Sequence, residues 1–216
     1  MSASATKKAV IYIFNTDSSY STEDRIKEAV HAFLRADASG RTSFSSCADT
    51  MLQIRRTPLG KPYLPLMPEI FVSASHSGDY LLCAVADTEI GVDIQRHETL
   101  KNETAEETNA RLAKLSKRYF HPEEAEFIIK EPWERFFKVW TAKESYVKYT
   151  GEGIDDNFKN FSVIPMDPCV LADGNSADAP AGWSAADVRF HQIRFDQQYT
   201  VCACTKELVN IDICRA

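Results

Sequence analysis

Short apolar runs alternate with helix-period segments along the first third of the chain. Residues 9–14 (AVIYIF) form one such run and predict a strand. Residues 21–36 predict a helix, because their apolar positions recur at the spacing of one helix face: Ile26, Ala29, Val30 and Phe33. Acids follow Thr22, which favours Thr22 as the N-terminal cap. Residues 37–50 are small and polar and predict a loop.

The rest of the chain predicts further strands around three helices. After a proline-rich extended segment, strands are expected in the apolar runs at 69–75, 79–86 and 89–95. Helices are expected at 103–118, 122–130 and 132–149, and Gly151 and Gly153 end the last of them. The final strands are expected at 162–165, 187–195 and 199–205, with a loop at 167–183.

One stretch of the chain repeats after 119 positions. Residues 80–94 (YLLCAVADTEIGVDI) align without a gap on residues 199–213 (YTVCACTKELVNIDI). Five positions are identical, although strands that draw on one small set of residues can also match by chance. Because the offset is close to half the chain, we expect an α+β pseudo-dimer of two related halves, residues 1–97 and 98–216. Each half is expected to pack an antiparallel sheet against helices.

Composition and charge exclude several classes of protein. The chain has 216 residues, of which 44% are hydrophobic and 26% charged, as in a folded globular protein. Its net charge of -6 disfavours nucleic acid and anionic membranes as partners. No apolar run approaches the ~20 residues of a membrane span, and the first residues lack a secretory signal. We therefore expect a cytoplasmic protein whose six cysteines, none in a CxxC motif, are reduced apolar residues.

Polar side chains on one strand and one helix are candidate metal ligands. In the third of the middle strands, Ile90, Val92 and Ile94 face one way, whereas Asp93 and Gln95 face the other with Gly91. In the long helix, Glu144 lies beside an apolar stripe and Lys148 follows one turn later. Asp93 and Glu144 can hold a hard cation, with Lys148 facing an anion. A solvated strand face and an ordinary Glu–Lys helix pair are the alternatives, and both stay open here.

Other residues are suited to contact a phosphate. The chain has neither GxxxxGK[ST] nor GxGxxG, so a nucleotide would not be held by a P-loop or a Rossmann turn. Lys61 lies on a segment stiffened by glycine and proline, which suits a fixed contact to an anion. Ser75, His76 and Ser77 offer several donors at one turn and can cradle an anion. A plain surface turn is the alternative for His76.

Four segments in order carry a resemblance to a known family: GKPYL at 60–64, SHS at 75–77, GVDI at 91–94 and WTAKES at 140–145. Together they resemble the 4′-phosphopantetheinyl transferase superfamily, in its long single-chain form, the surfactin-synthetase-activating type. The resemblance spans about residues 58–165, and the repeat extends it to the end of the chain. It implies the 4′-phosphopantetheinyl transferase fold, a pseudo-dimer of two α+β halves, and favours a monomer over the trimers of the short type.

The resemblance also implies roles at the metal end of the site. It assigns Asp93 and Glu144 to Mg²⁺, bound together with the pyrophosphate of coenzyme A. Gln95 stands where the family often has Glu. Because an amide oxygen is a weaker, neutral ligand, the alternatives are direct binding by Gln95 or a water in that place, and Mg²⁺ binding should be weaker. Lys148 would lie near the reacting phosphate.

At the other end of the site, the resemblance implies phosphate contacts. Lys61, Ser75 and His76 would contact phosphates of coenzyme A, the 3′-phosphate in particular. A basic residue of the N-terminal helix is expected to help, and Arg25 and Lys27 are the candidates.

The implied reaction moves phosphopantetheine from coenzyme A to a serine hydroxyl of an apo acyl or peptidyl carrier protein and releases adenosine 3′,5′-bisphosphate. Glu144 is the expected base, and Mg²⁺ with Lys148 is expected to stabilise the leaving oxygen. Carriers of fatty-acid, polyketide and non-ribosomal peptide synthesis all fit. Because such carriers are acidic, an acidic enzyme needs a local basic patch. We expect that patch on one helix, at Arg111, Lys114, Lys117 and Arg118, for which a solvated helix face is the alternative.

Two other functions compete with transfer. A catalytically silent module of the same fold would bind coenzyme A or a carrier, and the presence of Asp93, Glu144, Lys148 and Lys61 argues against it. Another metal-dependent phosphotransferase or hydrolase is disfavoured by the lack of a nucleotide-binding loop and of a third acid beside the metal.

Overall fold

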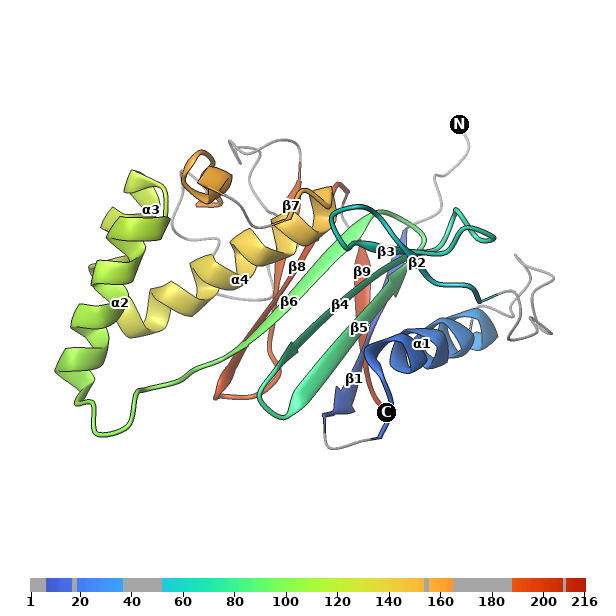
Figure 1. The fold of residues 1–216 in the computed structure, drawn as a ribbon, viewed down its shortest axis with the longest axis horizontal. Coiled ribbons are helices and arrows are strands. Elements are labelled where there is room, and N and C mark those ends of the chain that lie inside the picture. The colour runs from blue at the N-terminus through green and yellow to red at the C-terminus, as the bar shows by residue number, and fades with distance from the viewer. Residues whose placement is uncertain (1–6, 17–18, 37–51, 154–155, 165–187, 208) are drawn as a thin grey trace.

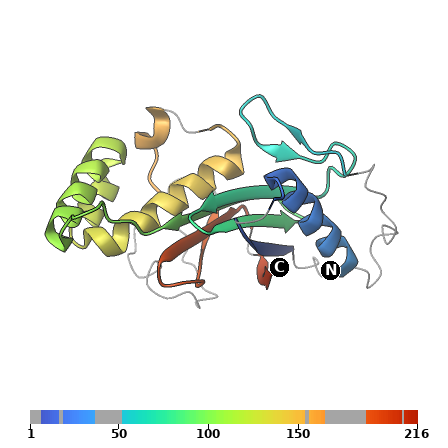
Figure 2. The same ribbon diagram turned by 60° about the horizontal axis from the view of Figure 1, so that its bottom comes forward.

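Two β-sheets lie between two groups of helices in the computed structural model (Figure 1; Figure 2). It describes residues 7–16, 19–36, 52–153, 156–164, 188–207 and 209–216. The four-stranded sheet has the order β4–β5–β1–β9, with bounds Phe71–Ser77, Tyr80–Ala86, Lys8–Asn15 and Asn210–Arg215. The three-stranded sheet has the order β6–β8–β7, with bounds Ile90–Arg96, Tyr199–Thr205 and Arg189–Ile193. A small hairpin joins β2 (Arg55–Arg56) to β3 (Pro62–Tyr63).

The helices cover the outer faces of these sheets. Their bounds are Thr22–Ala36 for α1, Ala105–Tyr119 for α2, Pro122–Ile128 for α3 and Pro132–Thr150 for α4, with a 3₁₀ turn η2 at Asp156–Lys159. α1 packs on the four-stranded sheet, and α4 packs on β6 and β8. α2 and α3 pack against the N-terminal part of α4, at the end away from the hairpin (Figure 1). The expected α+β class, with antiparallel sheets packed against helices, is confirmed, and among the strands of the described residues only β1 and β9 pair in parallel.

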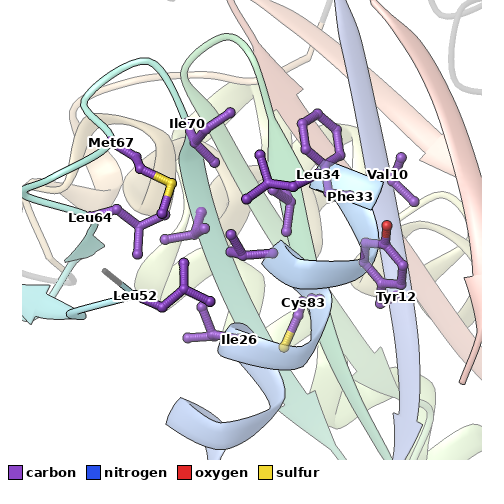
Figure 3. Close-up of a cluster of buried hydrophobic side chains, with 14 of the residues drawn as sticks. Val10, Tyr12, Ile26, Phe33, Leu34, Leu52, Leu64, Met67, Ile70 and Cys83 are labelled. Carbon is purple, nitrogen blue, oxygen red and sulfur yellow. The ribbon is translucent and has the colours of Figure 1, made fainter. Parts of the chain in front are cut away.

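Alternation along the strands divides the core into three clusters. In β1, Val10 and Tyr12 face α1 (Figure 3) and Phe14 belongs to the same cluster, whereas Ala9, Ile11 and Ile13 face the second sheet. The middle cluster is completed by Ile90, Val92 and Ile94 of β6. The third cluster lies around α4 and includes Phe136, Phe137 and Val147. Both faces of β1 are therefore buried, which explains why this strand is a nearly continuous apolar run. β6 buries Ile90, Val92 and Ile94 in the middle cluster and carries Gly91 and Asp93 on its other face.

The two halves of the sequence exchange strands. β6 belongs to the first half but pairs with β8 of the second, and β9 belongs to the second half but pairs with β1 of the first. The 119-residue offset carries Tyr80–Ala86, the bounds of β5, onto Tyr199–Thr205, the bounds of β8. Neither half of the sequence thus contains a complete sheet of its own.

Side chains take the place of backbone pairing where β4 meets β6. Each of the alternate serines Ser73, Ser75 and Ser77 accepts a hydrogen bond from a backbone N–H of β6. The donors are Val92, Ile94 and Arg96, at 3.1, 3.4 and 2.9 Å. These hydroxyls satisfy an edge of β6 that its own sheet leaves unpaired. We name this row of three contacts the serine seam.

Several local predictions are corrected by the structure. Ser21, not Thr22, caps α1, because the Asp24 N–H donates to Ser21 Oγ at 3.2 Å and the Ser21 N–H donates to Asp24 Oδ2 at 3.0 Å. Residues 162–164 form no strand. The expected loops at 37–50 and 167–183 lie outside the described residues. As predicted, α4 ends at Gly151, whose φ of 76° is the left-handed conformation that glycine adopts readily.

Candidate active site

A cleft of about 240 Å³ opens between the β2–β3 hairpin, β4 and the C-terminal part of α4. Four of its lining residues are basic and one is acidic: Arg56, Lys61, His76, Lys148 and Glu144. Thr22, Ser73 and Ser75 add hydroxyl groups to the lining. The hairpin and β4 follow each other closely in the sequence, whereas α4 is distant and meets them only in the fold (Figure 1).

Lys148, which lines the cleft, forms an ion pair with the buried Asp93 of β6. The Lys148 Nζ lies 2.6 Å from Asp93 Oδ1. Asp93 is only 4% exposed, and burial raises the pKa of its carboxyl group, against the opposing effect of Lys148. Its second oxygen, Oδ2, is buried and has no hydrogen-bond partner among the described residues. The alternative of a solvated strand face for Asp93 is therefore wrong.

A close approach of backbone brings Asp93 and α4 together. Gly91 lies two residues before Asp93 on the same face of β6. A Cβ atom at this position would lie 2.0 Å from the Ser145 carbonyl oxygen and 2.4 Å from the Tyr149 nitrogen, both in α4. Only glycine leaves room for this contact, so the glycine of the GVDI segment sets the depth at which α4 sits on β6.

Glu144 is a buried acid with a perturbed ionisation. It is 6% exposed and lines the cleft from α4. Burial and, to a smaller extent, the neighbouring Asp93 charge raise the pKa of Glu144 to about 7, while Lys148 acts in the opposite direction. Such a carboxylate can accept a proton near neutral pH. The ion pair made by Lys148 runs to Asp93 on β6, and not along the helix to Glu144.

Two acids side by side form an environment that fits a divalent cation. A cation would supply a partner for Asp93 Oδ2 and would offset the repulsion that raises the pKa of Glu144. Among the described residues, no group of three His, Cys, Asp or Glu could hold a metal ion by itself. The remaining oxygens would have to come from water, substrate or the Gln95 amide. Gln95 is half-buried on the same strand, and its Nε2 donates to the Arg96 carbonyl at 3.1 Å.

The basic residues of the cleft differ in how far their charge is already compensated. Lys61 contacts the carboxylate of Glu89 and the Tyr149 carbonyl oxygen. Arg56 is exposed, and its Nη1 donates to the Gly60 carbonyl at 2.9 Å, across the turn that carries Lys61. Arg56 is not among the residues predicted from the sequence, although a second cation five residues before Lys61 was a usable signal. His76, at the end of β4, is exposed in the cleft wall.

Other predicted residues lie outside the cleft. Arg25 stacks on the rings of Phe14 and Tyr20 and pairs with Glu28 within α1, and Lys27 pairs with Glu23. In α2, Lys114, Lys117 and Arg118 are exposed, whereas Arg111 is bound by both carboxylate oxygens of Glu103. The Trp133 N–H at the start of α4 donates to Asn109 of α2. α2 therefore meets α4 near its first turn, and Glu144 lies ~16 Å beyond Trp133 along α4, at a rise of ~1.5 Å per residue.

Comparisons with known proteins agree on one family. The profile of the 4′-phosphopantetheinyl transferase superfamily matches residues 89–204. A 4′-phosphopantetheinyl transferase of Bacillus subtilis is 32% identical over 149 residues, which are 67% of this chain and 59% of that protein. The 4′-phosphopantetheinyl transferase Sfp of Bacillus subtilis (strain 168) is 26% identical over 82% of this chain and 75% of its own length. The L-aminoadipate-semialdehyde dehydrogenase-phosphopantetheinyl transferase of Xenopus laevis is 32% identical over 52% of this chain and 40% of its own.

Proposed function

Because the chain belongs to the 4′-phosphopantetheinyl transferase superfamily, we propose that it transfers the 4′-phosphopantetheine group of coenzyme A to a serine hydroxyl of an apo acyl or peptidyl carrier protein. The observation that carries this proposal is the pair of buried acids Asp93 and Glu144, because Asp93 is paired with Lys148 while Glu144 and Lys148 line a cleft that also holds Lys61, His76 and Arg56. The acids Asp93 and Glu144 suit a metal-bound pyrophosphate, and the cations Lys61, His76 and Arg56 suit a phosphate monoester.

None of the helices among the described residues is long and apolar enough to cross a membrane. A cytoplasmic location is part of the proposal, since Cys83, Cys202 and Cys204 are buried free thiols.

The reaction forms one bond to phosphorus and breaks another. The oxygen of the carrier serine attacks the β-phosphorus of coenzyme A, and the bond from that phosphorus to the bridging oxygen breaks. Adenosine 3′,5′-bisphosphate leaves with the bonding electrons. Glu144 is the proposed acceptor of the serine proton, because it is the acid that lines the cleft.

Asp93 and Glu144 would hold Mg²⁺, with Gln95 or water beside them. The metal, when bound, would neutralise charge that grows on the bridging oxygen. Lys148 would donate to the same oxygen after its ammonium turns from Asp93 toward the phosphate, and its contact with Asp93 supports this role. Lys61, His76 and Arg56 would bind the phosphate at the far end of coenzyme A. Positioning by these groups accounts for much of the remaining acceleration.

The carrier is proposed to dock beside α2 through Lys114, Lys117 and Arg118. Arg111 is a weaker candidate than its neighbours, because Glu103 already compensates its charge. Reversing the charge of Lys114 and Lys117 should raise the KM for the carrier more than the KM for coenzyme A. Equal effects on both substrates would count against docking on this helix.

Mass spectrometry of an apo carrier incubated with coenzyme A, Mg²⁺ and this protein tests the proposal. We expect a mass gain of one phosphopantetheine group and release of adenosine 3′,5′-bisphosphate. Asp93→Ala and Glu144→Ala should each abolish the gain while coenzyme A still binds. Unchanged carrier mass with wild-type protein that binds coenzyme A would favour the silent binding module, and wild-type turnover by either variant would overturn the roles given to these acids.

A further inference from the structure

Ser75 is the member of the serine seam that also reaches the acids of the cleft. All three serines accept a hydrogen bond from β6, but the Ser75 hydroxyl in addition donates to Asp93 Oδ1 at 2.7 Å. It also accepts from the Lys148 Nζ at 2.7 Å. The same Nζ lies 2.6 Å from the same Oδ1, so the three side chains form a closed triangle.

The hydrogen-bonding capacity of Ser75 is fully used inside this triangle and the seam. A serine hydroxyl has one hydrogen and two lone pairs. The hydrogen goes to Asp93, and the lone pairs accept from Lys148 and from the Ile94 N–H. Ser75 is only 7% exposed. Its side chain therefore has neither a free donor nor much accessible surface for a phosphate of coenzyme A.

We propose that Ser75 is a positioning residue: its hydroxyl holds Asp93 Oδ1, leaves Oδ2 available for a divalent cation, and fixes the resting place of Lys148. This inference rests on the proposed function for the identity of the substrate, and it replaces the expected contact between the Ser75 side chain and coenzyme A. Without the hydroxyl, the Asp93 carboxylate would lose its neutral hydrogen-bond donor and could rotate toward Lys148. Removing a group that orients a metal ligand typically weakens metal binding 10–100-fold.

The strand offers two matched controls for a test. Ser73→Ala and Ser77→Ala remove a hydroxyl from the same face of β4 and leave a β6 N–H without its acceptor, as Ser75→Ala does. Asp93 and Lys148 lose a contact only in Ser75→Ala. A purely structural role of the hydroxyl should therefore affect all three variants to a similar extent.

Two measurements on the full chain separate positioning from substrate binding. The affinity for Mn²⁺, followed by electron paramagnetic resonance at saturating coenzyme A, should fall at least tenfold in Ser75→Ala and stay within about twofold of wild type in both controls. The affinity for coenzyme A in a chelator, measured by calorimetry, should stay within about threefold of wild type in Ser75→Ala. The melting temperatures of the three variants should fall by similar amounts.

Three results would overturn the positioning role. These are unchanged Mn²⁺ affinity in Ser75→Ala, an equal loss in all three variants, or a tenfold loss of coenzyme A affinity in the chelator. The proposed function fails separately, if the wild-type protein binds coenzyme A and Mn²⁺ but leaves the carrier mass unchanged. In that case the Mn²⁺ comparison between Ser75→Ala and its controls still decides the inference.

Discussion

At the residue scale, some charged side chains of the site form ion pairs with an opposite charge, whereas others have no such partner among the described ion pairs. Lys148 and Lys61 are already paired with carboxylates, of Asp93 and Glu89 respectively. Glu144 has no comparable partner among the ion pairs of the described residues, and burial keeps its pKa high. The residues with the least compensated charge are therefore the ones whose substitution should change ionisation and substrate affinity most.

Glu144→Gln should change how stability depends on pH. The pKa of Glu144 is about 7 in the folded chain against an ordinary value of 4.5. Between these values the unfolded chain loses its proton first, so the free energy of unfolding falls as pH rises, by up to about 3 kcal/mol. The variant lacks this decline, so its free energy of unfolding should rise relative to that of wild type between pH 4.5 and pH 8. Urea denaturation at both pH values in a chelator measures the difference, and parallel pH profiles would contradict it.

Arg56→Gln should weaken coenzyme A binding about tenfold, because a guanidinium–phosphate contact contributes about 1.5 kcal/mol or more. Arg56 lines the cleft and has no carboxylate partner among the described ion pairs. Arg55→Gln is the matched control, since Arg55 lies on the same exposed strand but does not line the cleft. Titration calorimetry at low and high salt measures both variants. Equal losses in the two variants would indicate only a general effect of charge.

At the element scale, α4 is the part that assembles the site. One of its faces sits on β6 and β8, and its N-terminal part is held by α2 and α3. Glu144 and Lys148 lie on consecutive turns near its C-terminal end. Two contacts fix the position of α4 within the fold: the close approach at Gly91 and a buried ion pair between Lys143 and Glu124 of α3.

Gly91→Ala should destabilise the fold by more than about 3 kcal/mol, because the new methyl group meets backbone atoms of α4 that cannot move aside singly. Gly153→Ala is the control, since a Cβ there has nothing within 4 Å and the cost comes only from its φ of 77°. That cost is about 1 kcal/mol. The free energy of unfolding in urea gives the ranking, which the opposite order would refute.

The buried ion pair of Lys143 and Glu124 should affect stability most when only one of its two charges is removed. Both side chains are 0% exposed, and the Lys143 Nζ lies 2.9 Å from Glu124 Oε2. Lys143→Met leaves Glu124 buried without its cation and should cost about 3 kcal/mol or more. Adding Glu124→Gln should recover part of this loss, because the amide oxygen can still accept from the Val163 N–H. A double-mutant cycle measures the coupling, and additive costs would show that the pair does not act as a unit.

At the scale of the whole molecule, the exchange of β6 and β9 ties the two halves of the sequence together. The cluster between the sheets takes side chains from both halves, among them Ile11, Leu82, Ile94 and Val201. The cleft is likewise shared, because Lys61 and Ser75 come from the first half and Glu144 and Lys148 from the second. Such an arrangement makes the site dependent on assembly of the entire chain.

Separate fragments 1–97 and 98–216 should not fold alone, because each lacks a strand that its sheet requires. An equimolar mixture should recover sheet structure and a common thermal transition. Circular dichroism and amide NMR spectra of the fragments, alone and mixed, test this. A dispersed spectrum from either fragment by itself would show that the halves are independent domains.

The sequence by itself determined the periodic elements and the chemical types at the site. Continuous apolar runs and helix-period stripes predicted β1, β5, β6, α1 and α4, because burial on one or both faces leaves a local pattern. It could not determine which strands pair across the halves, that Ser75 touches Asp93 and Lys148, or that Arg56 joins the cleft. Ser75 lies 18 positions from Asp93 and 73 from Lys148, and Lys8 of β1 pairs with Asn210 of β9. Such contacts depend on strand exchange and on the depth of α4 above Gly91. Only tertiary packing decides such distances, because local propensity carries no information on which distant surfaces meet.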